Sequence, residues 1–306
     1  MEHIKEDNIC AHHINDGSGI CIPKNIIVNI HNKVINNSNK NDYNELIKEL
    51  GSELSCTNDN NIELCIINKA PIDEQMKTNL KKEYLKPEGA LDPVEWLNNT
   101  NIDEIQEQFY KKYPNYYYSY IHMIDFVMHP PDNEIKDHRI INIKDIDFVK
   151  ELNGVDYKNK ITSNNNKLKY YGVVFNTDPS HKSGQHWFSL FFNFASMGTI
   201  NDPWTLEYFN SSGEDIKTSG FNDYFKKLAI EISKGTNKVC NYIRVTKLQH
   251  QNTVTGNCGC YALGYIWDRL EKIPSSKYND PNELITDDKY VSNFRKRLFR
   301  PEENKN

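Results

Sequence analysis

The sequence predicts an α+β fold, in which helices pack against a central mixed sheet and a mainly helical region precedes it. Four segments in the second half of the chain are rich in aromatic and β-branched residues, which is typical of strands. Two other segments of that half carry apolar residues three and four positions apart, which is the spacing of one helix face. Elements of these two kinds bury their apolar faces against each other, and the expected result is a sheet with packed helices.

Residues 1–92 are expected to form a mainly helical accessory region, and residues 93–306 the main domain. Helical patterns cover Asn44 to Leu54 and Asp73 to Tyr84. The boundary is expected within Lys86 to Pro93, where two prolines and one glycine occur in eight residues. A helix from Ile102 to Tyr113 then opens the main domain, because acidic residues occupy its first turn, where the helix dipole favours them.

The main domain is expected to contain four strands and three further helices. The strands are Tyr170 to Asn176, His186 to Phe194, Trp204 to Phe209 and Tyr242 to Leu248. The helices are Asn222 to Ser233, a helix that begins at Cys258, and Asp287 to Leu298. This order places a cysteine at the N-terminus of a helix that packs against the sheet.

The composition limits the classes of protein to consider. The chain has 306 residues, of which 38% are hydrophobic, so it can bury the core of one large domain plus an accessory one. No apolar run approaches the roughly 20 residues of a membrane helix, and the N-terminus is polar. A net charge of -5 argues against broad attraction to nucleic acid. We therefore expect a soluble intracellular protein without a membrane partner, and nucleic acid is not indicated as a partner.

The cysteine pattern predicts thiols rather than bridges. Seven cysteines are an odd number scattered over a long chain, which fits reduced side chains better than a disulfide framework. Cys10, His12, His13 and Cys21 are zinc-type ligands, but their spacing matches no zinc-finger pattern. We therefore predict no metal site and no cofactor.

Three short segments together predict a site for cysteine chemistry. They are Gln185-His186-Trp187, Tyr208-Phe209-Asn210, and Gln251 to Gly259 with Cys258 near its end. A thiolate that attacks a carbonyl needs an imidazole to activate it, a group to orient that imidazole, and donors for the oxyanion. Cys258, His186, Asn210 and Gln251 supply one residue for each task.

The surroundings of Cys258 favour it over Cys260 as the nucleophile. A helix N-terminus lowers the pKa of a thiol, because unpaired N–H groups and the helix dipole favour the thiolate. Gly256 is expected to allow a tight turn into the helix, and Gly259 to let a substrate backbone approach. Trp187 beside the histidine is interpreted as an apolar wall over a substrate channel, or equally as a core side chain.

Two of the assignments have competitors in the sequence. Asn210 lies where a strand gives way to a turn, so Glu207 or Asp202 could orient the histidine instead. If Asn210 does so, its carbonyl is expected to accept the Nδ1–H of His186, without the charge that would stabilise an imidazolium. Gln249 competes with Gln251 as the oxyanion donor.

The order His, Asn, Cys, with the nucleophile on a helix, resembles the cysteine proteases that group adenovirus protease with the SUMO-specific proteases. The resemblance rests on Gly184-Gln185-His186-Trp187, on Leu206 to Gly213, on Gln251 to Gly259 and on Trp96-Leu97-Asn98, and it covers about the last 210 residues. Within that family the sequence is most similar to a viral polyprotein-processing protease. The resemblance implies Cys258 as nucleophile, His186 as base and acid, Asn210 as orienter, and Gln251 with the Cys258 N–H as oxyanion hole.

The function that the resemblance implies is a viral cysteine endopeptidase that cleaves structural polyproteins after Gly-Gly-type sites with a Cys-His-Asn triad. The alternative is an isopeptidase that removes SUMO or another ubiquitin-like modifier, and a third reading is an inactive, binding-only relative. The expected partner is therefore a polyprotein substrate or a ubiquitin-like conjugate, in the host cytoplasm or the virion. The chain contains no Gly-Gly dipeptide, so we do not expect it to process itself at that motif.

Overall fold

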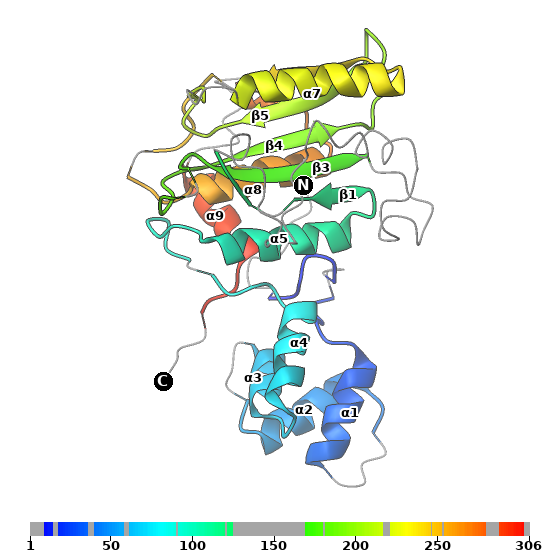
Figure 1. Cartoon of the computed structure of the whole chain (residues 1–306). Helices are drawn as coiled ribbons and strands as arrows, with labels where there is room; N and C mark the ends of the chain where they lie inside the picture. Colours follow the sequence, from blue (N-terminus) through cyan, green and yellow to red (C-terminus); the bar gives the residue numbers. More distant parts are fainter. Residues whose placement is uncertain are drawn as a thin grey trace. The chain divides into compact units, whose positions relative to one another are not determined.

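The computed structural model describes residues 9–14, 18–35, 40–57, 61–89, 91–119, 121–124, 169–179, 181–216, 221–245, 247–252, 254–279 and 288–302. The chain forms two compact units, drawn in Figure 1. Residues 1–89 and 296–306 make up the first unit, and residues 90–295 the second. The first unit therefore draws on both ends of the chain, a feature that a boundary sought along the sequence cannot reveal. The functional division into residues 1–92 and 93–306 stays a prediction.

Four helices occupy the described part of the first unit: α1 (Lys24–Val34), α2 (Tyr43–Glu53), α3 (Ile62–Lys69) and α4 (Glu74–Tyr84). Helices α2 and α4 begin after Asp42 and Asp73, whose carboxylates accept backbone N–H groups at 3.1 and 2.8 Å and so cap the first turns. The apolar faces of the helices share one core, which includes Ile22, Ile27, Ile30, Leu46, Leu50, Ile66 and Leu85. Helices α2 and α4 match the predicted ranges within a residue, whereas α1 and α3 were not predicted.

Arg300 joins the last described residues to the first unit. Its side chain is 4% exposed, and it donates to the Lys86 carbonyl at 3.0 Å and to the Glu88 carboxylate at 2.7 Å. A Cβ on Gly89 would lie 2.5 Å from the Phe299 ring, so only glycine allows this close approach. The charge of Arg300 is thus buried with its hydrogen-bond partners.

Two disulfides cross-link the first unit. They join Cys10 to Cys21 and Cys56 to Cys65, with Cα–Cα distances of 4.7 and 5.8 Å, whereas Cys240, Cys258 and Cys260 are free. The expectation of reduced thiols is therefore wrong for four of the cysteines. All bridged cysteines lie in the first unit and all free ones in the second. The odd number of cysteines in the whole chain therefore gave no sign of the two pairs. A small helical unit has a limited core, and bridges add stability to it by constraining the unfolded chain.

The bridges give a prediction for chemical labelling. Alkylation of the denatured protein without reductant should add three groups, on Cys240, Cys258 and Cys260, because the other four of the seven sulfurs are paired. Reduction before alkylation should raise the count to seven. Intact-mass measurement counts the groups, and peptide mapping locates them. Seven groups without reductant would contradict both bridges.

A mixed sheet forms the centre of the second unit. Its strands are β1 (Tyr116–Tyr118), β2 (His122–Met123), β3 (Tyr170–Asn176), β4 (Trp187–Asn193), β5 (Trp204–Phe209) and β6 (Cys240–Arg244). They lie in the order β1-β3-β4-β5-β6, and β2 also pairs with β3. Strands β3, β4 and β5 run antiparallel to their neighbours in this group, whereas β1, β2 and β6 pair in parallel with theirs. This architecture confirms the predicted α+β fold with a mixed sheet.

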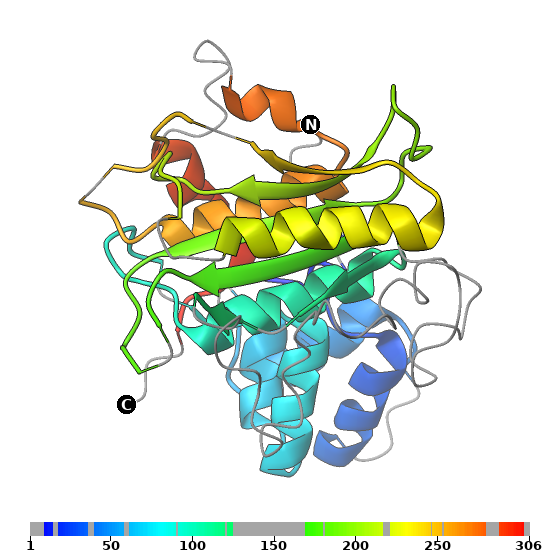
Figure 2. The same cartoon turned by 45° about the horizontal axis from the view of Figure 1, so that its top comes forward.

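Helices cover both faces of the sheet, as Figure 2 shows. Helix α7 (Phe221–Thr236) packs on the face that includes Val173, Leu190 and Leu206, and α8 (Cys258–Leu270) packs on the other face against β3 and β4. Helix α5 (Asn99–Lys112) lies beside α8. The 3-10 helix η1 (Ser275–Asn279) and helix α9 (Asp288–Leu298) follow, and Asp287, the predicted start of the last helix, lies outside the described residues. None of the helices in the described ranges has the length and apolarity to cross a membrane.

Candidate active site

A tight connection between β3 and β4 fixes the position of His186. Asn176, the last residue of β3, accepts the Gln185 N–H with Oδ1 at 3.2 Å. Gly184 has a φ of +89°, and a Cβ there would lie 2.5 Å from the Asn176 side chain. The His186 carbonyl accepts the Thr177 N–H at 2.9 Å. These contacts hold the His186 backbone one residue before β4 begins.

Asn210, directly after β5, is bonded to the His186 ring. Its Oδ1 lies 2.7 Å from His186 Nε2 and also accepts the backbone N–H and the hydroxyl of Ser212, both at 3.0 Å. Its Nδ2 donates to the Tyr208 hydroxyl at 3.0 Å and to the Glu214 carbonyl at 3.3 Å. The donors of Ser212 around Oδ1 and the acceptor oxygens around Nδ2 set the direction of the Asn210 amide. The amide oxygen, an acceptor, therefore faces His186.

This orientation decides which ring nitrogen carries the proton. Because Asn210 offers an acceptor, His186 donates from Nε2, and Nδ1 is left with its lone pair. The prediction that Asn210 holds Nδ1–H is therefore corrected to Nε2–H. Burial lowers the pKa of His186, while the bond to Asn210 and the charge of Glu214 act in the opposite direction. The ring is thus held neutral in the tautomer that a general base needs.

The two other candidate orienters are engaged elsewhere. Glu207 is 1% exposed and makes a two-pronged ion pair with Arg269, at 2.7 and 3.0 Å, on the face that α8 covers. Asp202 accepts the Met197 N–H at 2.9 Å in the loop between β4 and β5. Of the three residues weighed from the sequence, the one that the structure places against His186 is the asparagine.

Cys258 is the first residue of α8, as predicted, and its side chain is 2% exposed. The backbone of Trp187 acts to lower the pKa of the Cys258 thiol, which places the thiol beside the residue that follows His186. Burial raises the pKa of the Cys258 thiol, although the N–H groups of Trp187 and Gly259 and the charge of Arg295 oppose that rise. The expected lowering by the helix terminus is therefore outweighed, because the thiol is removed from water.

A buried arginine lies beneath the start of α8. Arg295 is 0% exposed and donates to the carbonyls of Asp92, Glu95 and Gly256 at 2.8, 2.6 and 3.2 Å. Its charge also opposes the rise in the pKa of the Cys260 thiol. The three carbonyls solvate a charge that has no access to water, which is the condition for burying it. Arg295 therefore links the cysteine helix to the chain just before α5.

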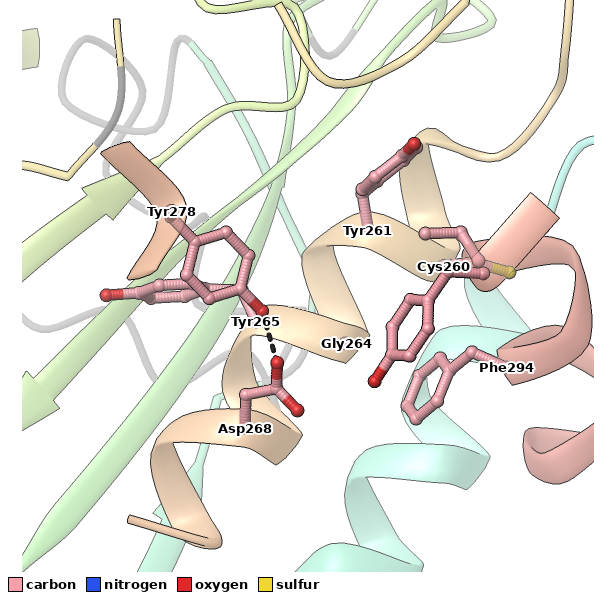
Figure 3. A pocket seen from close by; sticks show the side chains of 9 residues that line it. Cys260, Tyr261, Gly264, Tyr265, Asp268, Tyr278 and Phe294 are labelled. Atoms are coloured by element: carbon pink, nitrogen blue, oxygen red, sulfur yellow. Dashed lines mark hydrogen bonds between the residues drawn. The ribbon is translucent and has the colours of Figure 1, made fainter. Parts of the chain in front are cut away.

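Cys260 lies on the inner side of α8 and is unsuited to be the nucleophile. It is 0% exposed, and burial raises the pKa of its thiol to about 11. It lines a cavity of about 10 Å³, roughly the space of one water molecule. Figure 3 shows Cys260 and Phe294 among the side chains that line this cavity. Across that cavity Tyr278 donates to Asp268 at 2.6 Å. A peptide substrate has no room there.

Gln251 lies in the loop before α8, next to the turn that carries Asn210. Its Oε1 accepts the Ser211 hydroxyl at 2.8 Å, and its Nε2 donates to the Thr255 carbonyl at 2.9 Å. One N–H of the amide is therefore committed to the loop, and the second can serve an oxyanion. Gln249 donates to the Gln251 carbonyl at 3.0 Å. The choice between the two as oxyanion donor stays a prediction.

The two glycines around Cys258 serve contacts within the protein. A Cβ on Gly256 would lie 2.6 Å from the Glu95 carbonyl oxygen, and one on Gly259 would lie 3.1 Å from Leu97. The expectation that Gly259 makes room for substrate is therefore corrected, because it makes room for Leu97. Trp187 is 5% exposed and donates from its indole to the Leu97 carbonyl at 3.0 Å. Of its two predicted environments, the structure places it in the core, and a role in substrate binding stays a prediction.

Comparison with known proteins relates this arrangement to a viral enzyme. No family model matches the chain. The chain is 27% identical over 245 residues to the SUMO-1 cysteine protease of African swine fever virus (a Kenyan pig isolate), which is 78% of this chain and 82% of the relative. The cysteine protease of the Badajoz strain gives the same values. The chain is a homologue of the African swine fever virus cysteine protease. It is therefore a cysteine-type peptidase, and the predicted relationship and enzyme class are confirmed.

The solved structures of that viral protease share the fold of this homologue. One crystal structure is 23% identical, with a TM-score of 0.66 and coverage of 97% of each chain. Its selenomethionine form is 21% identical, with a TM-score of 0.68 and the same coverage of 97% of each chain. Agreement over both chains confirms the α+β architecture. The tasks of the individual site residues stay predictions.

A pocket beside His186 is lined in part by residues that were not predicted from the sequence to belong to the site. It has a volume of about 310 Å³. Its lining includes His186, Asn210, Ile124, Thr177, Ser212, Glu214, Asp215 and Ile216. Four of these eight, Ser212, Glu214, Asp215 and Ile216, follow Asn210 after β5, so the signal available in the sequence was their closeness to that residue. Ile124 could not be found in this way, since it comes from a distant part of the chain.

Proposed function

We propose that the protein is a viral cysteine endopeptidase that cleaves structural polyproteins after Gly-Gly sequences with a triad of Cys258, His186 and Asn210. The observation that carries the proposal is the 2.7 Å contact between Asn210 Oδ1 and His186 Nε2. This contact fixes the tautomer in which His186 Nδ1 is free to take a proton. The Cys258 thiol lies beside Trp187, the residue that follows His186. Homology to the African swine fever virus protease supports the reaction class.

The first half of the reaction forms a thioester. His186 Nδ1 takes the proton of the Cys258 thiol while the sulfur attacks the carbonyl carbon of the scissile bond. The Cys258 N–H, at the start of α8, and Gln251 Nε2 donate to the oxygen that becomes negative. The carbon–nitrogen bond then breaks, and His186 returns the proton to the leaving amine. Water completes the cycle, because the same nitrogen takes a proton from it as it attacks the thioester and returns that proton to the sulfur.

Burial sets the protonation state in which this pair rests. Burial raises the pKa of the Cys258 thiol and lowers the pKa of His186, so both shifts favour the uncharged forms. A neutral thiol and a neutral imidazole therefore face the substrate near pH 7, and proton transfer accompanies the attack. A neutral orienter suits this arrangement, since Asn210 fixes the ring without stabilising an imidazolium.

The preference for glycine follows from how little of the nucleophile is exposed. Cys258 is 2% exposed, so a substrate carbonyl must pass closely between neighbouring groups to reach its sulfur. Glycine has no Cβ and accepts backbone conformations that other residues avoid, so two glycines before the scissile bond fit a confined approach best. Structural polyproteins processed in the host cytoplasm or the virion are the proposed substrates.

The second candidate function is removal of a SUMO-like modifier from its conjugates. The observation that favours it is the name of the relative, a SUMO-1 cysteine protease. Ubiquitin-like modifiers joined through a C-terminal Gly-Gly would present the same carbonyl to the same thiol. The two functions differ in the leaving group, which is a peptide amine in one case and a lysine ε-amine in the other.

The purified protein should cut a Gly-Gly-Ala peptide after the second glycine and should cut a matched Ala-Ala-Ala peptide at least about tenfold more slowly in kcat/KM. Confinement of the thiol is the physical reason. Mass spectrometry locates the cut, and the Cys258→Ala variant provides the control. SUMO and ubiquitin isopeptide conjugates are assayed in parallel. Cleavage of the conjugates alone would establish the second function, and equal cleavage of both peptides would contradict the glycine preference.

A further inference from the structure

The pocket of about 310 Å³ lies beside His186, the residue that protonates the leaving amine in the proposed reaction. His186 and Asn210 line it, whereas Cys258 and Gln251, which hold the acyl half of the substrate, do not. His186 gives its proton to the leaving amine, so the chain that begins with that amine extends from Cys258 past the imidazole. The first side chain after the scissile bond therefore meets this pocket.

The walls of the pocket combine apolar and acidic groups. Ile124 and Ile216 are apolar lining residues, and Glu214 and Asp215 are acidic ones. Its volume of about 310 Å³ is near the lower end of the range of about 300–1,000 Å³ that is usual for ligand sites, which suits one long side chain. A lysine or arginine has an aliphatic stem for the isoleucines and a cation for the carboxylates.

The two carboxylates are not equivalent. Asp215 pairs with Arg244 at 3.0 Å, and Arg244 also donates to the Gly213 carbonyl, so this pair holds the turn. Glu214 takes part in no ion pair within the described ranges. Its exposed side chain leaves one negative charge at the pocket without a compensating cation in those ranges.

The backbone of Glu214 is tied to the proposed triad. Its carbonyl accepts the Tyr208 hydroxyl at 2.9 Å and Asn210 Nδ2 at 3.3 Å. The residue that supplies the negative charge is thus fixed at the group that orients His186. A cation drawn to Glu214 would arrive near the imidazole, because Asn210 contacts both Glu214 and His186.

We propose that this pocket is the subsite for the first residue after the scissile bond and that it prefers lysine or arginine there. The inference rests on the proposed endopeptidase function and adds a specificity to it. The stem of the basic side chain lies against Ile124 and Ile216, and its charge pairs with Glu214. Because Glu214 is exposed, the pairing gives a moderate preference that salt weakens.

The test uses three peptides that differ only after Gly-Gly, with lysine, methionine or glutamate at that position. The wild type should cut the lysine peptide with a kcat/KM about tenfold above the glutamate peptide, with methionine in between. Glu214→Gln should remove most of the difference, and Glu214→Lys should reverse the order. The matched control is Glu231→Lys on α7. It changes the net charge by the same amount at a residue that does not line the pocket, and it should keep the wild-type order.

Equal cleavage of the three peptides by the wild type would overturn the subsite, as would an unchanged order in Glu214→Lys. Absence of cleavage of every Gly-Gly peptide would instead reject the proposed function. In that case the pocket is judged by binding alone, with the Cys258→Ala variant and fluorescent peptides that begin with lysine or glutamate. The subsite is supported if the lysine peptide binds more tightly than the glutamate peptide and Glu214→Lys removes this difference. Equal affinities for the two peptides would overturn it.

Discussion

Replacing Cys258 by alanine should abolish peptide cleavage, with a loss in kcat/KM on the order of 10⁴-fold or more. The sulfur is the atom that forms the thioester, and no other thiol is placed to substitute for it. Cys260 lines a cavity with room for about one water molecule, and Cys240 belongs to the core on the face that α7 covers. The measurement is kcat/KM on a Gly-Gly-Ala peptide. Cys258→Ser is the sharper variant, because it keeps the side-chain shape and replaces a thiol with a far weaker acid.

Cys260→Ala is the matched control for this prediction. Cys260 is on the same helix, but it is 0% exposed and its thiol has a pKa raised to about 11. The variant should keep most of the activity, and thermal unfolding checks that it folds. A thiol-directed alkylator applied to the native protein should label Cys258 first. Equal loss of activity in the Cys258 and Cys260 variants would refute the assignment of the nucleophile.

His186→Ala should lower kcat/KM by about 10³- to 10⁴-fold, because it removes both the base that activates the thiol and the acid that protonates the leaving amine. Asn210→Ala should lose less, about 10- to 100-fold, since it removes the acceptor at 2.7 Å that fixes the ring but leaves the ring itself. Asn210→Asp should retain more activity than Asn210→Ala, because one carboxylate oxygen still accepts from Nε2. It should stay below the wild type, because it cannot donate to Tyr208 and the Glu214 carbonyl.

The rate of Cys258 alkylation, measured alongside cleavage, separates activation of the thiol from substrate binding. Glu207→Gln is the control for Asn210. It should lower the thermal stability by weakening the ion pair with Arg269, yet leave the pH profile of kcat/KM in place. Full activity of Asn210→Ala together with an altered pH profile of Glu207→Gln would move the orienting task to the glutamate.

The strands that could be predicted were those dense in aromatic residues. Strands β3 and β5 have the predicted bounds, and β4 differs by one residue at each end. Strand β6 ends at Arg244, not Leu248, because its register with β5 ends where Tyr208 pairs with Arg244. The end of a strand depends on how far its partner strand extends, and the sequence of the strand alone does not predict that length. Strands β1 and β2 are too short for a period of two to show, and only their pairing with β3 defines them.

The candidate site was predictable as a set of residues but not as a set of contacts. His186, Asn210 and Cys258 follow from residue types and order. The ring nitrogen that Asn210 holds depends on Tyr208 and the Glu214 carbonyl, which fix the amide from its other end. Gly259 could not be explained before its neighbour Leu97 was known. Burial also decides the net shift of the Cys258 pKa, since it outweighs the backbone N–H groups at the helix terminus and the charge of Arg295.

The location of the disulfides has a practical consequence for handling the enzyme. A nucleophilic thiol survives storage only when a reductant is present, because oxidation to sulfenic and higher acids removes its nucleophilicity. The same reductant opens disulfides by thiolate exchange, so a buffer that protects Cys258 endangers the two bridges of the first unit. The small exposed fraction of Cys258, 2%, slows its encounter with oxidants. The protein should therefore be assayed over a series of redox potentials, since the conditions that best preserve the bridges are not those that best preserve the nucleophile.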